Sequence, residues 1–119
     1  MRIYLDDDIR DHTLIAFLSK DGHDVFLPPE AEVGKHDALH FLAALRDGRA
    51  VLTRNYRDYD ALHDLVVGAA GHHAGVLEVR SDNDRKRDMS SKLIAATVSK
   101  IEKLGIEVPN QLIILNDWR

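Results

Sequence analysis

Three consecutive carboxylates follow a short apolar segment near the start of the chain. The segment is Ile3-Tyr4-Leu5, and the acidic run is Asp6-Asp7-Asp8. Like charges this close repel one another, so such a run is stable when it is fully solvated, partly protonated or bound to a cation. Oxygen ligands, in a chain without cysteine, suit Mg²⁺ or Mn²⁺. Hard-cation chemistry is therefore one of three interpretations of the run.

Other oxygen-bearing side chains stand close to the expected ends of strands and starts of helices. Asp37 opens an apolar helical pattern, and Asn55 and Asp58 follow the apolar segment 50–53. The carboxyl ends of parallel strands share one edge of the sheet, where open α/β folds bind ligands. We expect these three side chains to approach the acidic run there. Such a site could activate water and neutralise a phosphodiester, as hard divalent ions do in nucleases.

The same residues also have structural interpretations. Aspartate before a helix commonly caps its free N–H groups, which applies to Asp8, Asp37 and Asp58. Asn55 tolerates the backbone of a turn, and Asp7 could be a solvated neighbour. Asp6 is the hardest to explain structurally, because it follows Leu5 at a strand end and begins no helix.

Apolar residues alternate along the chain between strand and helix periodicity. Strands are predicted at 3–5, 23–27, 50–53, 76–79 and 111–115. Helical patterns run from Leu14 to a stop at Gly22, from Asp37 to Asp47-Gly48, from Asp58 to Gly68 and from Met89 to Gly105. This alternation predicts one α/β domain over residues 1–119, with a mainly parallel sheet flanked by helices.

Finer expectations concern individual elements. Val51 and Leu52 should lie in a central strand, because their strand is apolar without alternation, and the strand at 111–115 should be peripheral. Either Asp8 or Asp11 should cap the first helix. The third helix should turn Tyr59, Leu62, Leu65 and Val66 inward. Arg80 to Asp88 should form a charged connection.

Composition limits the classes of function. The chain has 119 residues and a net charge of −4, which argues against a protein that binds nucleic acid with its whole surface. An enzyme with a small basic patch remains compatible, and Arg54 and Arg57 are candidates to contact substrate phosphate, or else solvated turn residues. No apolar run approaches the roughly 20 residues of a membrane span. We expect a cytoplasmic protein with no membrane contact.

Histidine-based and nucleophilic chemistry are weakly supported. Four histidines stand at surface-like positions without a metal-binding spacing: His12, His23, His36 and His40. His72 and His73 are adjacent, so their side chains point apart in an extended segment. No serine or threonine has a convincing His and Asp arrangement, and no glycine-rich phosphate loop follows a strand.

Four ordered segments resemble a known family. They are Met1–Asp8, Gly22–Val25, Val51–Tyr59 and His73–Leu77. In this order they resemble the small PIN-like proteins of the DUF5615 type, which are related to the Mut7-C and VapC-toxin PIN domains. The resemblance covers roughly the first 80 residues, and the ordered set is more specific than any single motif.

The resemblance implies a PIN-like fold with an acidic pocket for Mg²⁺ or Mn²⁺ and a ribonuclease activity, often that of the toxin in a toxin–antitoxin pair. By position, the acidic and amide residues that match the family are Asp6, Asp7, Asp37, Asn55 and Asp58. Asp6 and Asp58 would be the principal ligands. Many members have Asp where this chain has Asn55, a neutral ligand at best.

The partners that the resemblance suggests are an RNA substrate and an antitoxin protein, and a homodimer is a further candidate assembly. PIN-like members that lack part of the acidic set can act as binding modules. The competing hypothesis is therefore a non-catalytic PIN-like interaction or RNA-binding module.

Overall fold

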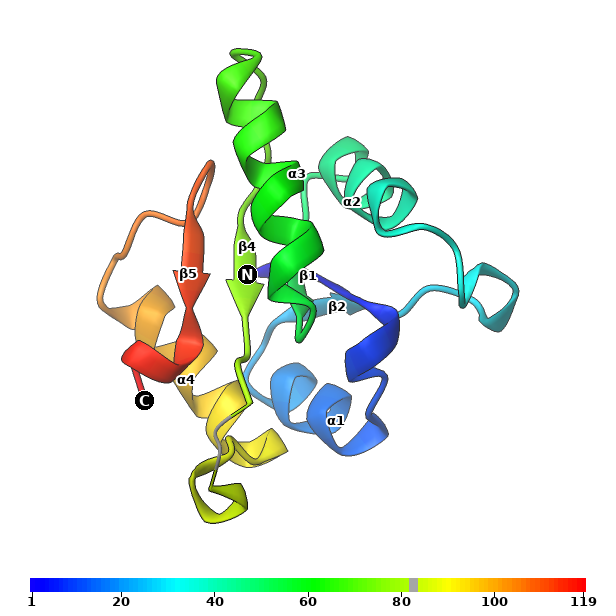
Figure 1. Cartoon of the computed structure of the whole chain (residues 1–119). Helices are drawn as coiled ribbons and strands as arrows, with labels where there is room; N and C mark the ends of the chain where they lie inside the picture. The colour runs from blue at the N-terminus through cyan, green and yellow to red at the C-terminus, as the bar shows by residue number, and fades with distance from the viewer. Residues whose placement is uncertain (82–83) are drawn as a thin grey trace.

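The chain folds around one parallel sheet. The computed structural model describes residues 1–81 and 84–119. Its strands are β1 (Arg2–Leu5), β2 (Asp24–Phe26), β3 (Ala50–Thr53), β4 (Val76–Glu78) and β5 (Leu112–Ile114). They lie in the order β2-β1-β3-β4-β5, and every neighbouring pair is parallel. The α/β prediction is confirmed, with β3 central and β5 at an edge (Figure 1).

Within the described residues, four α-helices cover the sheet on both faces (Figure 1). They are α1 (His12–Lys20), α2 (Asp37–Arg46), α3 (Tyr56–Gly68) and α4 (Ser91–Lys103). Short 3-10 helices are η1 (Asp7–Ile9), η2 (Glu30–Glu32), η3 (Arg85–Arg87) and η4 (Leu115–Asp117). None of the helices in the described parts of the chain has the length and apolar character needed to cross a bilayer.

Alternate residues of the strands belong to two separate hydrophobic cores, one on each face of the sheet. Ile3 and Leu5 pack with residues of α1 and α4. Tyr4 and Val51 pack instead with residues of α2 and α3. Because both faces of the sheet are covered, a short strand such as β3 is buried along its whole length, which explains its continuous apolar character.

Two expectations about burial are wrong. Leu65 was expected to face inward but is 68% exposed, because the buried stripe of α3 follows Tyr59, Leu62 and Val66 at spacings of three and four residues. His23 and His40 were expected at surface-like positions but are buried. Hydrogen bonds to both nitrogens of each ring allow that burial.

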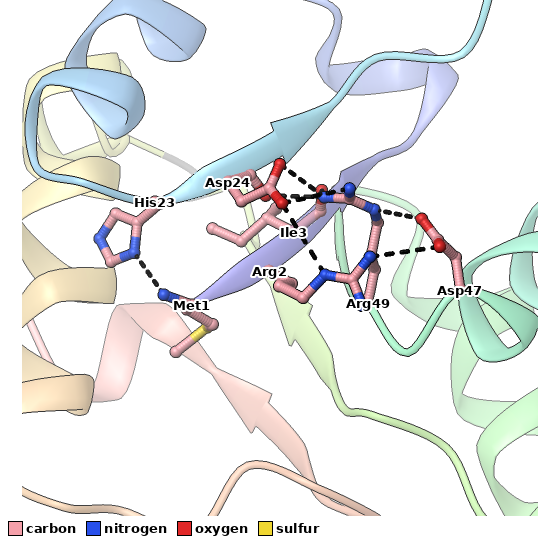
Figure 2. Close-up of polar contacts among 7 residues, drawn as sticks. All are labelled: Met1, Arg2, Ile3, His23, Asp24, Asp47 and Arg49. Atoms are coloured by element: carbon pink, nitrogen blue, oxygen red, sulfur yellow. Dashed lines mark hydrogen bonds and ion pairs between the residues drawn. The ribbon is translucent and has the colours of Figure 1, made fainter.

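An ionic network ties together the amino-terminal ends of three strands (Figure 2). The buried Arg49, just before β3, donates to the carboxylates of Asp24 and Asp47 and to the carbonyl oxygens of Ile3 and Asp24. Arg2 pairs with the same two carboxylates. We call Arg2, Asp24, Asp47 and Arg49 the arginine network.

The charged connection after β4 begins at a fixed residue. The N–H of Arg80 donates to Asn116 Oδ1, and the Asn116 amide donates back to the Arg80 carbonyl, each at 2.8 Å. Asp82 and Asn83, within the predicted connection, lie outside the described residues. The start of this connection is therefore anchored to the segment that follows β5.

Candidate functional site

The strand order changes direction between β1 and β3. From β1 the chain crosses to β2 on one side, and from β3 it crosses to β4 on the other. Helices α1 and α3, which follow these two strands, pack on opposite faces. At such a switch point the two loops diverge, and open α/β sheets bind their ligands in the crevice beyond the strand ends.

Asp6 and Asp8 come together at this point on the hydroxyl of Thr53. Thr53 Oγ1 donates to Asp6 Oδ2 at 2.7 Å and lies 3.4 Å from Asp8 Oδ2. The N–H of Arg54 donates to Asp8 Oδ1 at 3.1 Å. Asp6 is 1% exposed, and its second oxygen, Oδ1, is buried without a well-formed hydrogen bond among the described residues, although the buried Tyr59 hydroxyl lies close enough for an interaction with Asp6 to raise the pKa of Tyr59. A buried carboxylate oxygen without a well-formed hydrogen bond is costly, so it is available for a ligand.

Asp37 and Asp58 form a second pair on the side chain of Asn55. Asn55 Nδ2 donates to Asp37 Oδ2 at 2.6 Å and to Asp58 Oδ2 at 3.0 Å. Partial burial, a hydrogen bond with Asp58 and the nearby charges raise the pKa of Asp37 to about 6. The hydrogen bond from Asn55 lowers the pKa of the exposed Asp58. When Asp37 and Asp58 hold one proton between them, Asp37, the less exposed carboxyl, is therefore the protonated residue.

The two pairs together form what we call the acidic cluster: Asp6, Asp8, Asp37 and Asp58. Asp6, Asp58 and Asp8 all contribute to the raised pKa of Asp37, and burial followed by the charges of Asp6 and Asp37 raises the pKa of Tyr59. Across the described residues, no cationic side chain makes an ion pair with any of the four. The cluster therefore carries negative charge that no ion pair among the described residues neutralises, and the positive charge of Arg54 acts on it through Asp8.

Asp7 turns away from the acidic cluster. Its Oδ2 accepts hydrogen bonds from the N–H of Gly34 at 2.8 Å and from His40 Nε2 at 3.1 Å. His40 Nδ1 in turn lies 2.8 Å from the hydroxyl of Tyr4. The structure thus uses Asp7 to hold the loop before α2, through an Asp–His–Tyr chain.

Of the four aspartates considered as caps, Asp11 makes a capping hydrogen bond, whereas three do not: Asp8, Asp37 and Asp58. The cap of α1 is Asp11, whose side chain accepts from the N–H of Thr13. Asp37 and Asp58 lie inside the first turns of α2 and α3, behind N-terminal residues that make no side-chain cap bond. Their carboxylates are therefore directed to the site by Asn55 instead.

Sequence reasoning missed the contributions of Asp8 and Thr53. Asp8 and Asp11 were competing caps, and only the tertiary fold decides between them. Thr53 had a usable signal, because it closes a continuous apolar strand directly after Leu52, just as Asp6 follows Leu5. The register of β1 on β3 pairs Leu5 with Leu52, which places Asp6 beside Thr53.

Comparison with known proteins assigns no family to the chain. No family model, curated protein or solved structure matches it. The chemistry of the acidic cluster must therefore be inferred from its own residues.

The donor atoms of the acidic cluster fit a hard divalent cation. All are carboxylate oxygens, the ligand type that Mg²⁺ and Mn²⁺ prefer. Within residues 1–81 and 84–119, no three His, Cys, Asp or Glu side chains already converge in an arrangement that holds a metal. Thr53 and Asn55 hold the carboxylates as two separate pairs, so binding requires the Asn55 NH₂ group to release Asp37 and Asp58.

Proposed function

We propose that the acidic cluster binds Mg²⁺ or Mn²⁺ and that the protein is a metal-dependent ribonuclease of the PIN-like type. The observation that carries this proposal is the buried Asp6, whose Oδ1 makes no well-formed hydrogen bond with another described residue, at the switch point beside three further carboxylates. Uncompensated carboxylates in such a position destabilise a fold unless a cation joins them. A divalent ion would supply that cation.

Asp6, Asp37 and Asp58 are the proposed ligands, with Asp8 beside them. The hydroxyl of Thr53 orients Asp6, and the N–H of Arg54 orients Asp8. Asp7, expected from the sequence to complete the shell, supports it indirectly by holding the loop before α2. When bound, the metal would activate a water molecule and neutralise charge on the phosphodiester.

RNA as substrate is supported by two basic residues, Arg54 in the turn between β3 and α3 and Arg57 in the first turn of α3. Arg54 and Arg57 flank Asn55 and form no ion pair with another described residue. Arg57 interacts with the ring of Tyr56, and Arg54 interacts with the charge of Asp8. Neither guanidinium is neutralised in an ion pair with a described residue, so both can meet phosphate oxygens, for which Arg is well suited. With a net charge of −4, the protein would touch RNA through this patch rather than through its whole surface.

A non-catalytic RNA-binding module is the second candidate, and Asn55 favours it. The amide directs its NH₂ group at Asp37 and Asp58 and supplies no negative charge, so metal binding would be weaker than with Asp at this position. A role as the toxin of a toxin–antitoxin pair, an antitoxin partner, a homodimer and a cytoplasmic location all stay predictions.

The ribonuclease proposal is tested with metal-stripped protein and a mixed single-stranded RNA pool. Wild-type protein should cleave the pool when Mn²⁺ is added, and EDTA or Asp6→Asn should abolish cleavage. Asp64→Asn, which removes an exposed carboxylate elsewhere on α3, should cleave like the wild type. Asn55→Asp should tighten Mn²⁺ binding and preserve or raise the rate.

Two results would decide against the enzyme. Cleavage that persists both in EDTA and in Asp6→Asn would come from a contaminating nuclease. An RNA pool that stays intact with wild-type and Asp6→Asn protein across the Mn²⁺ titration would favour the binding module.

A further inference from the structure

A buried glutamate extends the row of polar residues beyond the acidic cluster. The register of β3 on β4 pairs Thr53 with Glu78, so the two side chains emerge on the same face of the sheet, under α3. Glu78 is 0% exposed. Asp6, Thr53 and Glu78 therefore lie side by side at the carboxyl ends of three adjacent strands.

Glu78 is held in an unfavourable environment. Its Oε1 accepts from Arg80 Nη2 at 3.1 Å, and its buried carboxyl shares a hydrogen bond with the carboxyl of Asp60 on α3. Burial, together with the nearby Asp60 carboxyl, raises the pKa of Glu78 to about 8. Buried acidic side chains with a strongly shifted pKa are often found at functional sites. Glu78 accepts the hydrogen bond from Arg80 Nη2 and thereby fixes the position of the Arg80 guanidinium.

Arg80 is fixed in both its backbone and its side chain. Asn116 binds its N–H and its carbonyl. Arg80 Nη2 also lies 3.6 Å from Asp60 Oδ2 on α3. The guanidinium is therefore preorganised, and its Nε has no hydrogen-bond partner among the described residues.

The guanidinium of Arg80 lies against an aromatic ring at the start of α3. Its Cζ is 4.6 Å from the centroid of the Tyr56 ring, and the exposed Arg57 lies 5.9 Å from the same centroid. Tyr56 is half-buried and directly follows Asn55, the residue that joins Asp37 and Asp58. An aromatic ring with two guanidinium groups thus borders the acidic cluster.

We propose that Tyr56, Arg57 and Arg80 form a platform that binds one nucleotide of single-stranded RNA beside the acidic cluster, with Glu78 as the positioning residue for Arg80. The base stacks on Tyr56, from which the exposed Arg57 can be displaced. The guanidinium groups of Arg57 and Arg80 contact the adjoining phosphate. This inference rests on the proposed function and narrows its substrate to unpaired RNA.

Unpaired RNA fits this arrangement better than a duplex does. A base inside a duplex already stacks on its neighbours, whereas an unpaired base can be turned onto an aromatic side chain. Such stacking tolerates every base, because each has a π-face. The platform therefore selects for single strands without reading their sequence.

The test measures binding without any cleavage. A fluorescein-labelled single-stranded RNA oligonucleotide is titrated with metal-stripped protein in EDTA, and anisotropy gives Kd. Tyr56→Ala should weaken binding about tenfold, and Tyr56→Phe by less than about twofold, because the phenyl ring keeps the stacking surface. Arg80→Gln should weaken binding and reduce the salt dependence by about one phosphate contact.

Two further variants separate the platform from general effects. Glu78→Gln should weaken binding less than Arg80→Gln, because it loosens the guanidinium without removing it. Arg46→Gln, which removes an exposed cation in the last turn of α2, should bind like the wild type. An oligonucleotide that lacks its bases should bind the unaltered protein as weakly as normal RNA binds Tyr56→Ala, a result that does not depend on the folding of any variant.

The outcomes keep this inference apart from the ribonuclease proposal. Equal Kd values for wild type, Tyr56→Ala and Arg80→Gln, or no binding by the wild type, would overturn the platform. Equal affinity for normal and base-free RNA would overturn it as well. If Tyr56→Ala weakens binding but neither the wild type nor any variant cleaves RNA with Mn²⁺, the platform is supported and the ribonuclease proposal is rejected.

Discussion

The two ends of the sheet use aspartate in opposite ways. At the amino-terminal end, Asp24 and Asp47 each pair with the arginines of the arginine network (Figure 2). At the carboxyl-terminal end, the acidic cluster makes no ion pair with any described residue. Charges paired within the chain tie elements together, whereas charges that no ion pair neutralises are available to a ligand.

The difference predicts opposite responses to mutation. Removing a charge from the arginine network should destabilise the fold, because its remaining groups lose their partners. Removing a charge from the carboxyl-terminal end should stabilise the metal-free fold, because repulsion and burial there are uncompensated. Each prediction below tests one side of this comparison.

The largest effect is expected from Glu78 at high pH. Its pKa is raised from about 4.5 to about 8 in the folded protein, so its contribution to stability is fully present below pH 4.5 and is lost as the pH rises through 8. Relative to Glu78→Gln, the wild type should lose about 3–5 kcal/mol of unfolding free energy between pH 4.5 and 9. Urea unfolding at several pH values measures this. A difference independent of pH would show that Glu78 ionises as freely in the folded protein as in the unfolded chain.

The next effect is expected from the arginine network. Arg49→Ala removes bonds to two carboxylates and two backbone carbonyl oxygens and should lower the unfolding free energy by about 2–3 kcal/mol. Arg46→Ala, at an exposed position of α2, should change it by less than about 0.5 kcal/mol. Equal losses in the two variants would mean that the network does not stabilise the fold.

The fold was predictable because local patterns determined it. The continuous apolar character of Val51 and Leu52 placed β3 at the centre, and the alternation of strands and helices gave the parallel sheet. Burial of His40 was not predictable, because its partners Tyr4 and Asp7 come from β1 and η1, far from α2 along the chain. The exposure of Leu65 was not predictable for another reason. Which residues of α3 are buried depends on how the helix is rotated against the sheet, and the tertiary packing sets that rotation.

The candidate site was predictable in part. Asp6, Asp37, Asn55 and Asp58 were expected at one edge, and the structure brings them there. The turn of Asp7 towards Gly34 and the pairing of Asp8 with Thr53 depend on the 3-10 helix after β1 and on strand register. Neither of these two contacts could be predicted from the local sequence. The same holds for Arg80 and Tyr56, which lie far apart along the chain.

A smaller effect is expected from Asp37 in the metal-free protein. Its pKa is raised to about 6 in the folded state, so its contribution to stability is lost as the pH rises from about 4 through 6. Asp37→Asn should therefore raise the unfolding free energy at pH 7.5 by about 1 kcal/mol and leave it nearly unchanged at pH 4. Chemical denaturation in EDTA measures this. A destabilised Asp37→Asn at pH 7.5 would show that the pair on Asn55 holds the fold together.

The most direct test of the comparison is the melting temperature with and without Mn²⁺. A ligand that binds only the folded protein raises its stability by about 2.7 kcal/mol at a hundredfold excess over Kd. The matched variants are Asp6→Asn in the acidic cluster and Asp24→Asn in the arginine network. Wild type and Asp24→Asn should show the same Mn²⁺-induced rise, whatever their starting temperatures, and Asp6→Asn should show almost none. An equal rise in all three proteins would contradict a metal site at the carboxyl-terminal end of the sheet.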